Sequence, residues 1–175
     1  YRRRQLCYNC PMKTALVVID VQKYFVNENT QDLPSRIRDY INKNNFDFII
    51  FSKEVNNKNS NFFKLLNWKK MFSSPDTDIH PTLSKFANSD NTFEKSTYSI
   101  FKAKGFLNFL KKHNISRLYF CGIDIDACVL ASAFDAFDFG YEIKVLKDLS
   151  KSHSGKDLDE AALKIINKNL DKSGK

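Results

Sequence analysis

A cysteine with two nearby aspartates is the first feature that could carry chemistry. The segment CGIDIDACVL (121–130) contains Cys128, with Asp126 two residues before it and Asp124 four residues before it. Because neighbouring carboxylates raise the pKa of a thiol, a thiolate here would need positive charge from elsewhere in the chain. One interpretation is a buried structural thiol, and the other is a nucleophile that attacks an acyl carbon. The choice depends on the elements that position this cysteine.

The sequence alternates predicted strands and helices. Strands are predicted at 15–20, 46–52, 91–96, 117–123 and 141–148. Helices are predicted at 34–44, 104–114, 127–140 and 156–170, with a short helix at 61–70 inside a loop over 53–80. This alternation predicts an α/β fold, a mostly parallel sheet covered by helices on both faces in a three-layer αβα sandwich.

Residues at the carboxyl ends of these strands should gather at one edge of the sheet, where such folds bind ligands. Asp20 ends the first predicted strand, Lys95 ends the third, and Cys128 begins the helix after the fourth. The helix N-terminus and the charge of Lys95 would favour a thiolate, and Asp20 could accept the thiol proton. Each residue alone has a structural explanation, as a turn former, a solvated lysine or an inert thiol. Together they favour a nucleophilic site for an acyl group, with backbone N–H groups holding the oxyanion.

Three segments resemble motifs of the isochorismatase-like cysteine hydrolases. ALVVIDVQKYF resembles the first motif of that family, FEKSTYSIF its lysine segment, and YFCGIDIDACVLASAFDAFDFGYEIKVLKD its cysteine segment. The matches occur in the family order and cover most of residues 14–150. The resemblance implies a Rossmann-like isochorismatase-like fold. It also implies a cysteine-dependent amidohydrolase acting on a small amide, ureido or related C–N substrate, similar to nicotinamidases, N-carbamoylsarcosine amidohydrolases and ureidoacrylate hydrolases.

The resemblance also implies roles for individual residues. Asp20 would be the general base, Lys95 the cation that lowers the thiol pKa, and Cys128 the nucleophile that forms a thioester acyl-enzyme. The oxyanion hole would use the backbone N–H groups of Asp124 and Cys128, with a cis peptide bond between Ile123 and Asp124. Because family members that cleave the vinyl ether of isochorismate often lack the cysteine, its presence favours C–N hydrolysis.

Further residues of the motifs are assigned to the pocket or to the core. Gln22, Phe25 and Tyr98 are predicted to bind substrate, although simple core packing is an equal alternative for Phe25. Phe101 is expected to belong to the core. Asp126 is predicted to be structural, either capping the next helix or pairing with a nearby group.

The chain departs from the family pattern in three places. Glu54 and Asn56 occupy positions where nicotinamidases have an Asp and a His that bind a metal, and no His follows nearby. Because one carboxylate with amides is a poor transition-metal site, we expect no metal and no cofactor, which argues against nicotinamidase activity. Asp124 replaces a small residue or Thr and is expected to narrow the pocket or to favour a cationic substrate group. The final edge strand of the family is expected to be missing or reduced.

Composition and charge bound the expected partners and location. The 175 residues suit one domain, predicted over 14–172, with a basic N-terminal tail at 1–13. The formal net charge is +8, but the lysines are spread along the chain, so we expect a small-molecule substrate and no nucleic-acid partner. No apolar run approaches the roughly 20 residues of a membrane span, and no signal peptide is expected, so a cytoplasmic protein without membrane contact is predicted.

Two other classes of function compete with a hydrolase. One is a non-catalytic isochorismatase-like scaffold that binds ligands or assembles, and the resemblance itself favours a homo-oligomer. The other is a redox protein that uses Cys7 and Cys10, or Cys121 and Cys128. Cys7 and Cys10 have no second pair and no nearby histidine, so we expect an ordinary reduced pair. Cys121 lies inside a predicted strand and is expected to be buried.

Overall fold

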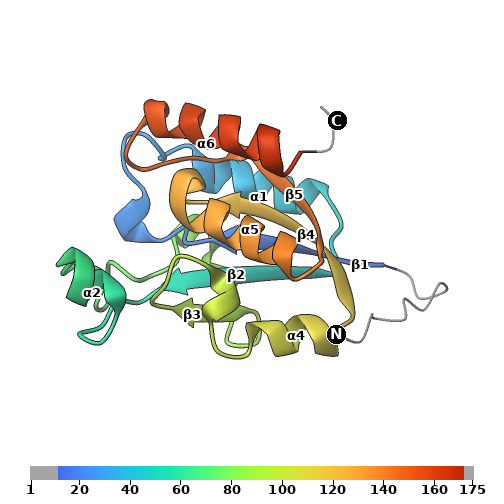
Figure 1. The fold of residues 1–175 in the computed structure, drawn as a ribbon, viewed down its shortest axis with the longest axis horizontal. Coiled ribbons are helices and arrows are strands. Elements are labelled where there is room, and N and C mark those ends of the chain that lie inside the picture. The colour runs from blue at the N-terminus through green and yellow to red at the C-terminus, as the bar shows by residue number, and fades with distance from the viewer. Residues whose placement is uncertain (1–11, 172–175) are drawn as a thin grey trace.

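A single five-stranded sheet organises the computed structural model, which describes residues 12–171 (Figure 1). The strand order is β3-β2-β1-β4-β5, and all four pairings are parallel. The strands are β1 (Lys13–Ile19), β2 (Phe48–Glu54), β3 (Thr92–Lys95), β4 (Ile115–Gly122) and β5 (Glu142–Ser150). Each lies within about two residues of a strand predicted from the sequence, because runs buried on both faces are the clearest signal of a parallel sheet.

Helices lie between consecutive strands and after the last strand. They are α1 (Leu33–Lys43), α2 (Asn61–Leu66), α3 (Pro81–Ser84), α4 (Phe106–Lys112), α5 (Leu130–Asp138) and α6 (Lys156–Asn169). Shorter turns are η1 (Lys23–Phe25), η2 (Ile100–Lys102) and the π-helical turn η3 (Ile125–Val129). The sequence did not predict α3, and the helix predicted over 127–140 is two elements, η3 and α5. None of the described helices is long and apolar enough to cross a membrane.

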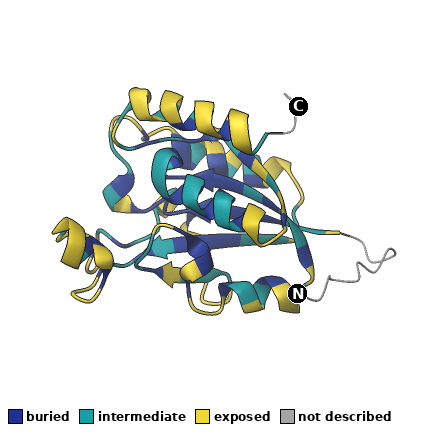
Figure 2. Cartoon of the chain, viewed as in Figure 1, coloured by how far each residue is buried: buried dark blue, intermediate teal, exposed yellow. Residues whose placement is uncertain are grey.

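The helices cover both faces of the sheet, which confirms the predicted three-layer αβα sandwich. Alternate residues of β1 point to opposite faces: Val17 packs in the layer with α4, α5 and α6, and Val18 packs in the layer with α1. Figure 2 shows buried strands between helices whose outer surfaces are exposed. Burial on both faces explains why β1 is an uninterrupted apolar run.

The carboxyl ends of β1 and β4 approach each other closely. Gly122 has a φ of 121°, and a Cβ atom built on it would lie 2.1 Å from the carbonyl oxygen of Ile19. Only glycine therefore fits at the end of β4. Asp20 follows β1 with a φ of 47°, a left-handed conformation that aspartate tolerates better than most residues. These two backbone turns bring the ends of β1 and β4 together at the site described below.

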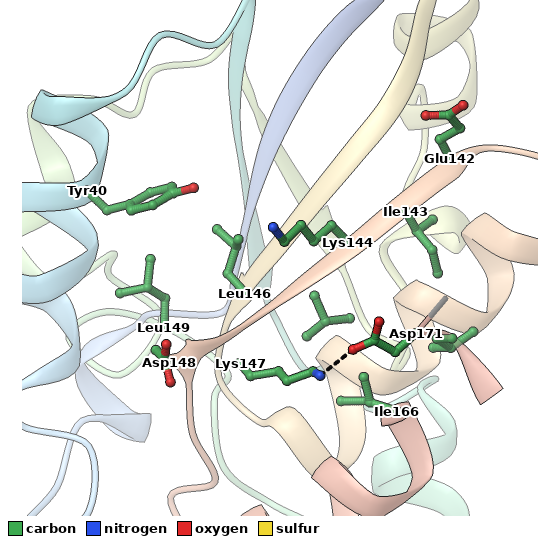
Figure 3. A pocket seen from close by; sticks show the side chains of 12 residues that line it. Tyr40, Glu142, Ile143, Lys144, Leu146, Lys147, Asp148, Leu149, Ile166 and Asp171 are labelled. Carbon is green, nitrogen blue, oxygen red and sulfur yellow. Dashed lines mark hydrogen bonds and ion pairs between the residues drawn. The ribbon is translucent and has the colours of Figure 1, made fainter. Parts of the chain in front are cut away.

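The edge strand β5 pairs irregularly with β4. Phe120 pairs with Val145, but Gly122 pairs with Ser150, so β5 carries extra residues relative to β4. A groove of about 630 Å³ runs along this edge between α1 and the end of α6, and an ion pair between Lys147 and Asp171 crosses it (Figure 3). Within residues 12–171 no strand follows α6.

Candidate active site

The carboxyl ends of four neighbouring strands converge on one buried cluster. Asp20 follows β1, Glu54 is the last residue of β2, Lys95 is the last residue of β3, and Cys128 lies in η3 just after β4. Because the four strands are adjacent and parallel, their carboxyl ends share one edge of the sheet. The structure thus brings together the three residues predicted to be catalytic, and it adds Glu54 to them.

Lys95 is the centre of this cluster. Its Nζ lies 2.6 Å from Asp20 Oδ2 and 2.9 Å from Glu54 Oε2, and it donates a hydrogen bond of 3.5 Å to Cys128 Sγ. It also donates to the carbonyl oxygen of Thr97 at 3.0 Å. The Lys95 side chain has no exposed surface. Burial lowers the pKa of Lys95, but Asp20, Cys128 and Glu54 raise it more strongly, so the ammonium keeps its charge.

Asp20 is held in place from the neighbouring strand. The hydroxyl of Ser52 on β2 donates to Asp20 Oδ1 at 2.6 Å, and the backbone N–H of Asp20 donates back to Ser52 Oγ at 3.1 Å. The other carboxylate oxygen faces Lys95. With both oxygens engaged and no exposed surface, the carboxylate has a fixed orientation toward the cluster.

Opposing influences act on the pKa of the Cys128 thiol. Burial raises its pKa well above the ordinary value; Lys95 lowers it, while Asp20 and Glu54 raise it further. Lys95 acts in the direction predicted from the sequence, but burial outweighs its effect on the pKa of Cys128. The carboxylate of Asp20 can accept a hydrogen bond from the protonated thiol, which also raises the pKa of Cys128.

Glu54 is a functional candidate that sequence analysis assigned only to a lost metal position. Burial raises its pKa to about 8, with Lys95 acting against that shift and Asp20 reinforcing it. One of its oxygens, Oε1, is buried with no hydrogen-bond partner among the described residues. The available signal was its place at the end of a predicted strand, beside Ser52, on the same edge as Asp20.

The peptide bond between Ile123 and Asp124 is cis, as the family resemblance predicted. The carboxylate of Asp124 accepts the backbone N–H of His153 at 2.7 Å, and its two oxygens lie 2.9 and 2.7 Å from His153 Nδ1. Because the Asp124 carboxylate is already paired with His153, the structure does not support the expected preference for a cationic substrate group. Use of the backbone N–H groups of Asp124 and Cys128 as an oxyanion hole stays a prediction.

A cavity of about 280 Å³ opens above Cys128. Its lining residues are Tyr24, Phe25, Glu54, Phe62, Leu66, Trp68, Tyr98, Asp124, Ala127, Cys128 and His153. Most of this surface is aromatic or aliphatic, and the polar groups lie near Cys128 and Asp124. A small, largely apolar cavity with a few convergent polar groups is typical of a small-molecule site.

The three residues predicted to bind substrate have different positions. Phe25 and Tyr98 line the cavity, and the Phe25 ring also contacts Trp68 and His153. Gln22 does not line it. Gln22 is fully buried, where its amide donates to the carbonyl oxygens of Glu54 and Thr77 and accepts the Glu54 N–H. Gln22 therefore joins the end of β2 to the following loop, and its predicted contact with substrate finds no support in the residues that line the cavity.

Phe101 has the core position predicted for it, whereas Asp126 lacks part of its predicted pairing. Phe101 is buried in the core and stacks on Phe139, as expected. Asp126 lies in the first turn of η3, and its Oδ1 is buried with no hydrogen-bond partner among the described residues. The predicted cap or pairing is therefore not seen for that oxygen.

Asn56, which occupies the position of a metal-binding His in nicotinamidases, has a structural role in this chain. Asn56 donates to the carbonyl oxygens of Trp68 and Lys70 at 2.9 and 3.0 Å, and its own oxygen accepts the Ser60 hydroxyl. These bonds fold the loop after β2 over the cavity. No group of three or more His, Cys, Asp or Glu side chains in residues 12–171 is arranged to hold a metal ion. The residues present therefore do not fit the metal site of nicotinamidases.

The remaining cysteines give no support to a redox pair within the described residues. Cys121 is buried in β4, and both Cys121 and Cys128 are free thiols. Burial raises the pKa of Cys121, which makes it an inert core thiol. Cys7 and Cys10, with most of the predicted basic tail, lie outside the described residues.

The parallel five-stranded sheet flanked by helices defines an α/β protein, with Asp20, Lys95 and Cys128 gathered at the strand ends. The family model that describes the isochorismatase domain matches residues 14–172. The chain therefore belongs to the isochorismatase-like hydrolase family. Among curated proteins, none matches the chain significantly.

Solved structures share the fold over almost the whole chain. An isochorismatase-like hydrolase from Alkaliphilus metalliredigens is 21% identical, with a TM-score of 0.77 over 89% of this chain and 91% of that one. A nicotinamidase from Bacillus subtilis is 22% identical, with a TM-score of 0.74 over 90% and 96%. An N-carbamoylsarcosine amidase from Thermoplasma acidophilum is 18% identical, with a TM-score of 0.74 over 90% and 92%. At these identities the likeness shows the fold alone.

Proposed function

We propose that the chain is a cysteine-dependent hydrolase of a small amide, ureido or related C–N substrate. The observation that carries the proposal is the contact of Lys95 with both Asp20 and Cys128 beneath a small cavity. Membership of a hydrolase family supports it. Acyl transfer needs a nucleophile, a proton acceptor and a fixed charge within contact distance, and these three side chains have those properties.

Acylation of Cys128 would be the first step. The Cys128 proton moves to Asp20 as Sγ attacks the carbonyl carbon, and a tetrahedral oxyanion forms. The backbone N–H groups of Asp124 and Cys128 stabilise that oxyanion, following the family pattern. The C–N bond then breaks, Asp20 returns the proton to the departing nitrogen, and ammonia or an amine leaves behind a thioester on Cys128.

Hydrolysis of the thioester completes the cycle. Asp20 takes a proton from water, and the resulting oxygen nucleophile attacks the thioester carbonyl. The second tetrahedral intermediate collapses, the carboxylic or carbamic acid leaves, and the proton returns to Cys128. Lys95 keeps its charge throughout and offsets the negative charge of Asp20 and the charge that develops on the sulfur.

A release assay for ammonia tests this proposal. The candidate substrates are nicotinamide, pyrazinamide, carbamoyl amino acids, ureidoacrylate-like compounds and simple amides. We expect release from at least one of them by the wild-type chain and none by Cys128→Ala. The competing hypothesis, a non-catalytic scaffold, predicts that small amides bind equally well to Cys128→Ser and that no chain releases ammonia. The homo-oligomeric state and the cytoplasmic location stay predictions.

A further inference from the structure

His153 is fixed at the cavity by contacts from three sides. Its Nδ1 and backbone N–H are both bound by the carboxylate of Asp124, within 2.9 Å. Its carbonyl oxygen accepts from the side-chain amides of Asn27 at 2.8 Å and Asn29 at 3.0 Å. The edge of its ring packs against Phe25, with ring centroids 5.3 Å apart. Such restraint holds the imidazole in one orientation against the cavity.

The bond between His153 Nδ1 and Asp124 leaves Nε2 as the ring nitrogen that can bind a ligand. Nδ1 donates to the carboxylate, so Nε2 is the remaining polar atom of the ring. Among the described residues that line the cavity, His153 is the one side chain that can carry positive charge. The other lining groups are two carboxylates, a thiol and aromatic or aliphatic side chains. An anionic group on a substrate would therefore have one side-chain partner of opposite charge in this cavity.

The surroundings favour the doubly protonated imidazole. The hydrogen bond to Asp124 raises the pKa of His153, burial acts in the opposite direction, and Asp126 raises it further. The other charged groups near this loop are Asp159 on α6, which binds the Ser152 N–H, and Lys151, which pairs with Asp32. In the charged form Nε2 carries a hydrogen and donates a charge-assisted bond.

We propose that His153, held by Asp124, selects substrates that carry a carboxylate or a similar anionic acceptor, while their scissile C–N group lies against Cys128. The inference rests on the hydrolase function proposed above and names its substrate class. The aromatic side chains of Phe25, Phe62 and Trp68 line the same cavity of about 280 Å³, so a compact and flat acid-bearing amide or ureide fits best.

Calorimetric binding to the unreactive Cys128→Ala chain tests the proposal without requiring catalysis. One probe pair is 3-carbamoylbenzoate against benzamide, and the other is N-carbamoylglycine against its methyl ester. We expect each acid to bind about tenfold or more tightly than its neutral partner, because a hydrogen bond to a charged group has this effect. Adding His153→Gln, which keeps a donor but no charge, should remove that preference.

The control variants separate recognition from folding. His113→Gln alters a histidine at the end of α4 that packs on Phe48 and Phe109, away from the cavity, and should keep the preference intact. Asp124→Asn leaves the ring of His153 in place but removes the negative charge beside it, and should weaken the preference. This variant provides a second test should His153→Gln fail to fold.

Three results would overturn the proposal: failure of both acids to bind, equal affinity for acid and neutral probes, or a preference that persists in His153→Gln. The hydrolase function is judged separately, from ammonia release by the wild-type chain. Tight binding of the acids with no ammonia released would contradict hydrolysis and still support recognition by His153. Ammonia release without a preference for acids would support hydrolysis and contradict recognition by His153.

Discussion

The floor and the wall of the cavity are built from different kinds of structure. The floor consists of Asp20, Glu54, Lys95 and Cys128, which lie at the ends of adjacent parallel strands and are almost completely buried. The wall consists of Phe62, Trp68, Tyr98 and His153, which come from loops and a short helix. A rigid sheet fixes the groups that do chemistry, and loops fixed by side-chain hydrogen bonds supply the contacts that choose a substrate. Changes to the floor should therefore affect kcat, and changes to the wall should affect KM.

The largest effect is expected from removing the nucleophile. Cys128→Ala should reduce ammonia release by about four orders of magnitude or more, because it removes the thiol that forms the proposed acyl intermediate. The matched control is Cys121→Ala, which removes a buried thiol from the core of β4 and should retain release. Substantial activity in Cys128→Ala would exclude sulfur as the nucleophile.

Replacement of Lys95 should affect both rate and stability. Lys95→Met keeps the apolar stem but leaves Asp20 and Glu54 buried without a counter-charge. We expect kcat to fall by about two to four orders of magnitude and the free energy of unfolding by about 3–5 kcal/mol. Steady-state kinetics and urea denaturation measure the two losses. Lys95→Arg, which keeps the charge, should recover part of the stability, and a Met variant with normal kcat would remove Lys95 from the mechanism.

Glu54 should make the stability of the chain depend on pH. Burial raises its pKa from 4.5 to about 8, so between these values the folded chain binds more protons than the unfolded chain. Its contribution to stability is therefore complete at low pH and declines as pH rises through this window, by up to about 1.4 kcal/mol per pH unit. Urea denaturation from pH 5 to pH 8 should show a flatter decline for Glu54→Gln. Parallel slopes for the two chains would contradict the raised pKa.

A smaller effect should distinguish a structural from a substrate-binding role for Gln22. Gln22→Ala leaves the buried Glu54 N–H and the carbonyl oxygens of Glu54 and Thr77 without their partner. We expect a loss of about 1–3 kcal/mol in the free energy of unfolding, measured by urea denaturation. A rise in KM with unchanged stability would instead support direct contact with substrate.

The smallest effect is expected at the wall. Tyr98 is half-exposed, and its ring packs edge-on against Phe62 at 4.9 Å between centroids. Tyr98→Ala removes one aromatic contact from the substrate, so KM should rise by about three- to tenfold and by more than kcat falls. A change confined to kcat would contradict the claim that wall residues affect KM and floor residues affect kcat.

The floor was largely predictable because it follows from the sheet. Once β1, β3 and β4 are recognised as parallel strands, the carboxyl-end rule selects Asp20, Lys95 and the region of Cys128. The same rule applies to Glu54, which follows the second predicted strand, but its contact with Lys95 depends on the strand order, with β2 between β1 and β3. The periodicity of a segment predicts that it forms a strand, but it does not predict which strands lie next to each other in the sheet.

Apart from Tyr98, which the family motif assigned to the pocket, the wall was not predictable, for two physical reasons. His153 was missed because β5 was expected to end at Asp148, whereas the irregular pairing with β4 carries the strand to Ser150. The loop that carries Trp68 has no periodic pattern, since its shape depends on the hydrogen bonds of Asn56. Such contacts join particular side chains to particular carbonyl groups, and composition gives no sign of them.

Mass spectrometry of the chain during turnover tests the central claim most directly. An active substrate is mixed with the wild-type chain and quenched in acid within the first turnovers, and the peptide that contains Cys128 is then weighed. The account predicts an added mass equal to the acyl part of the substrate, which disappears as ammonia release is completed and never forms in Cys128→Ala. Ammonia release at an undiminished rate with no adduct on Cys128 at any quench time would contradict it.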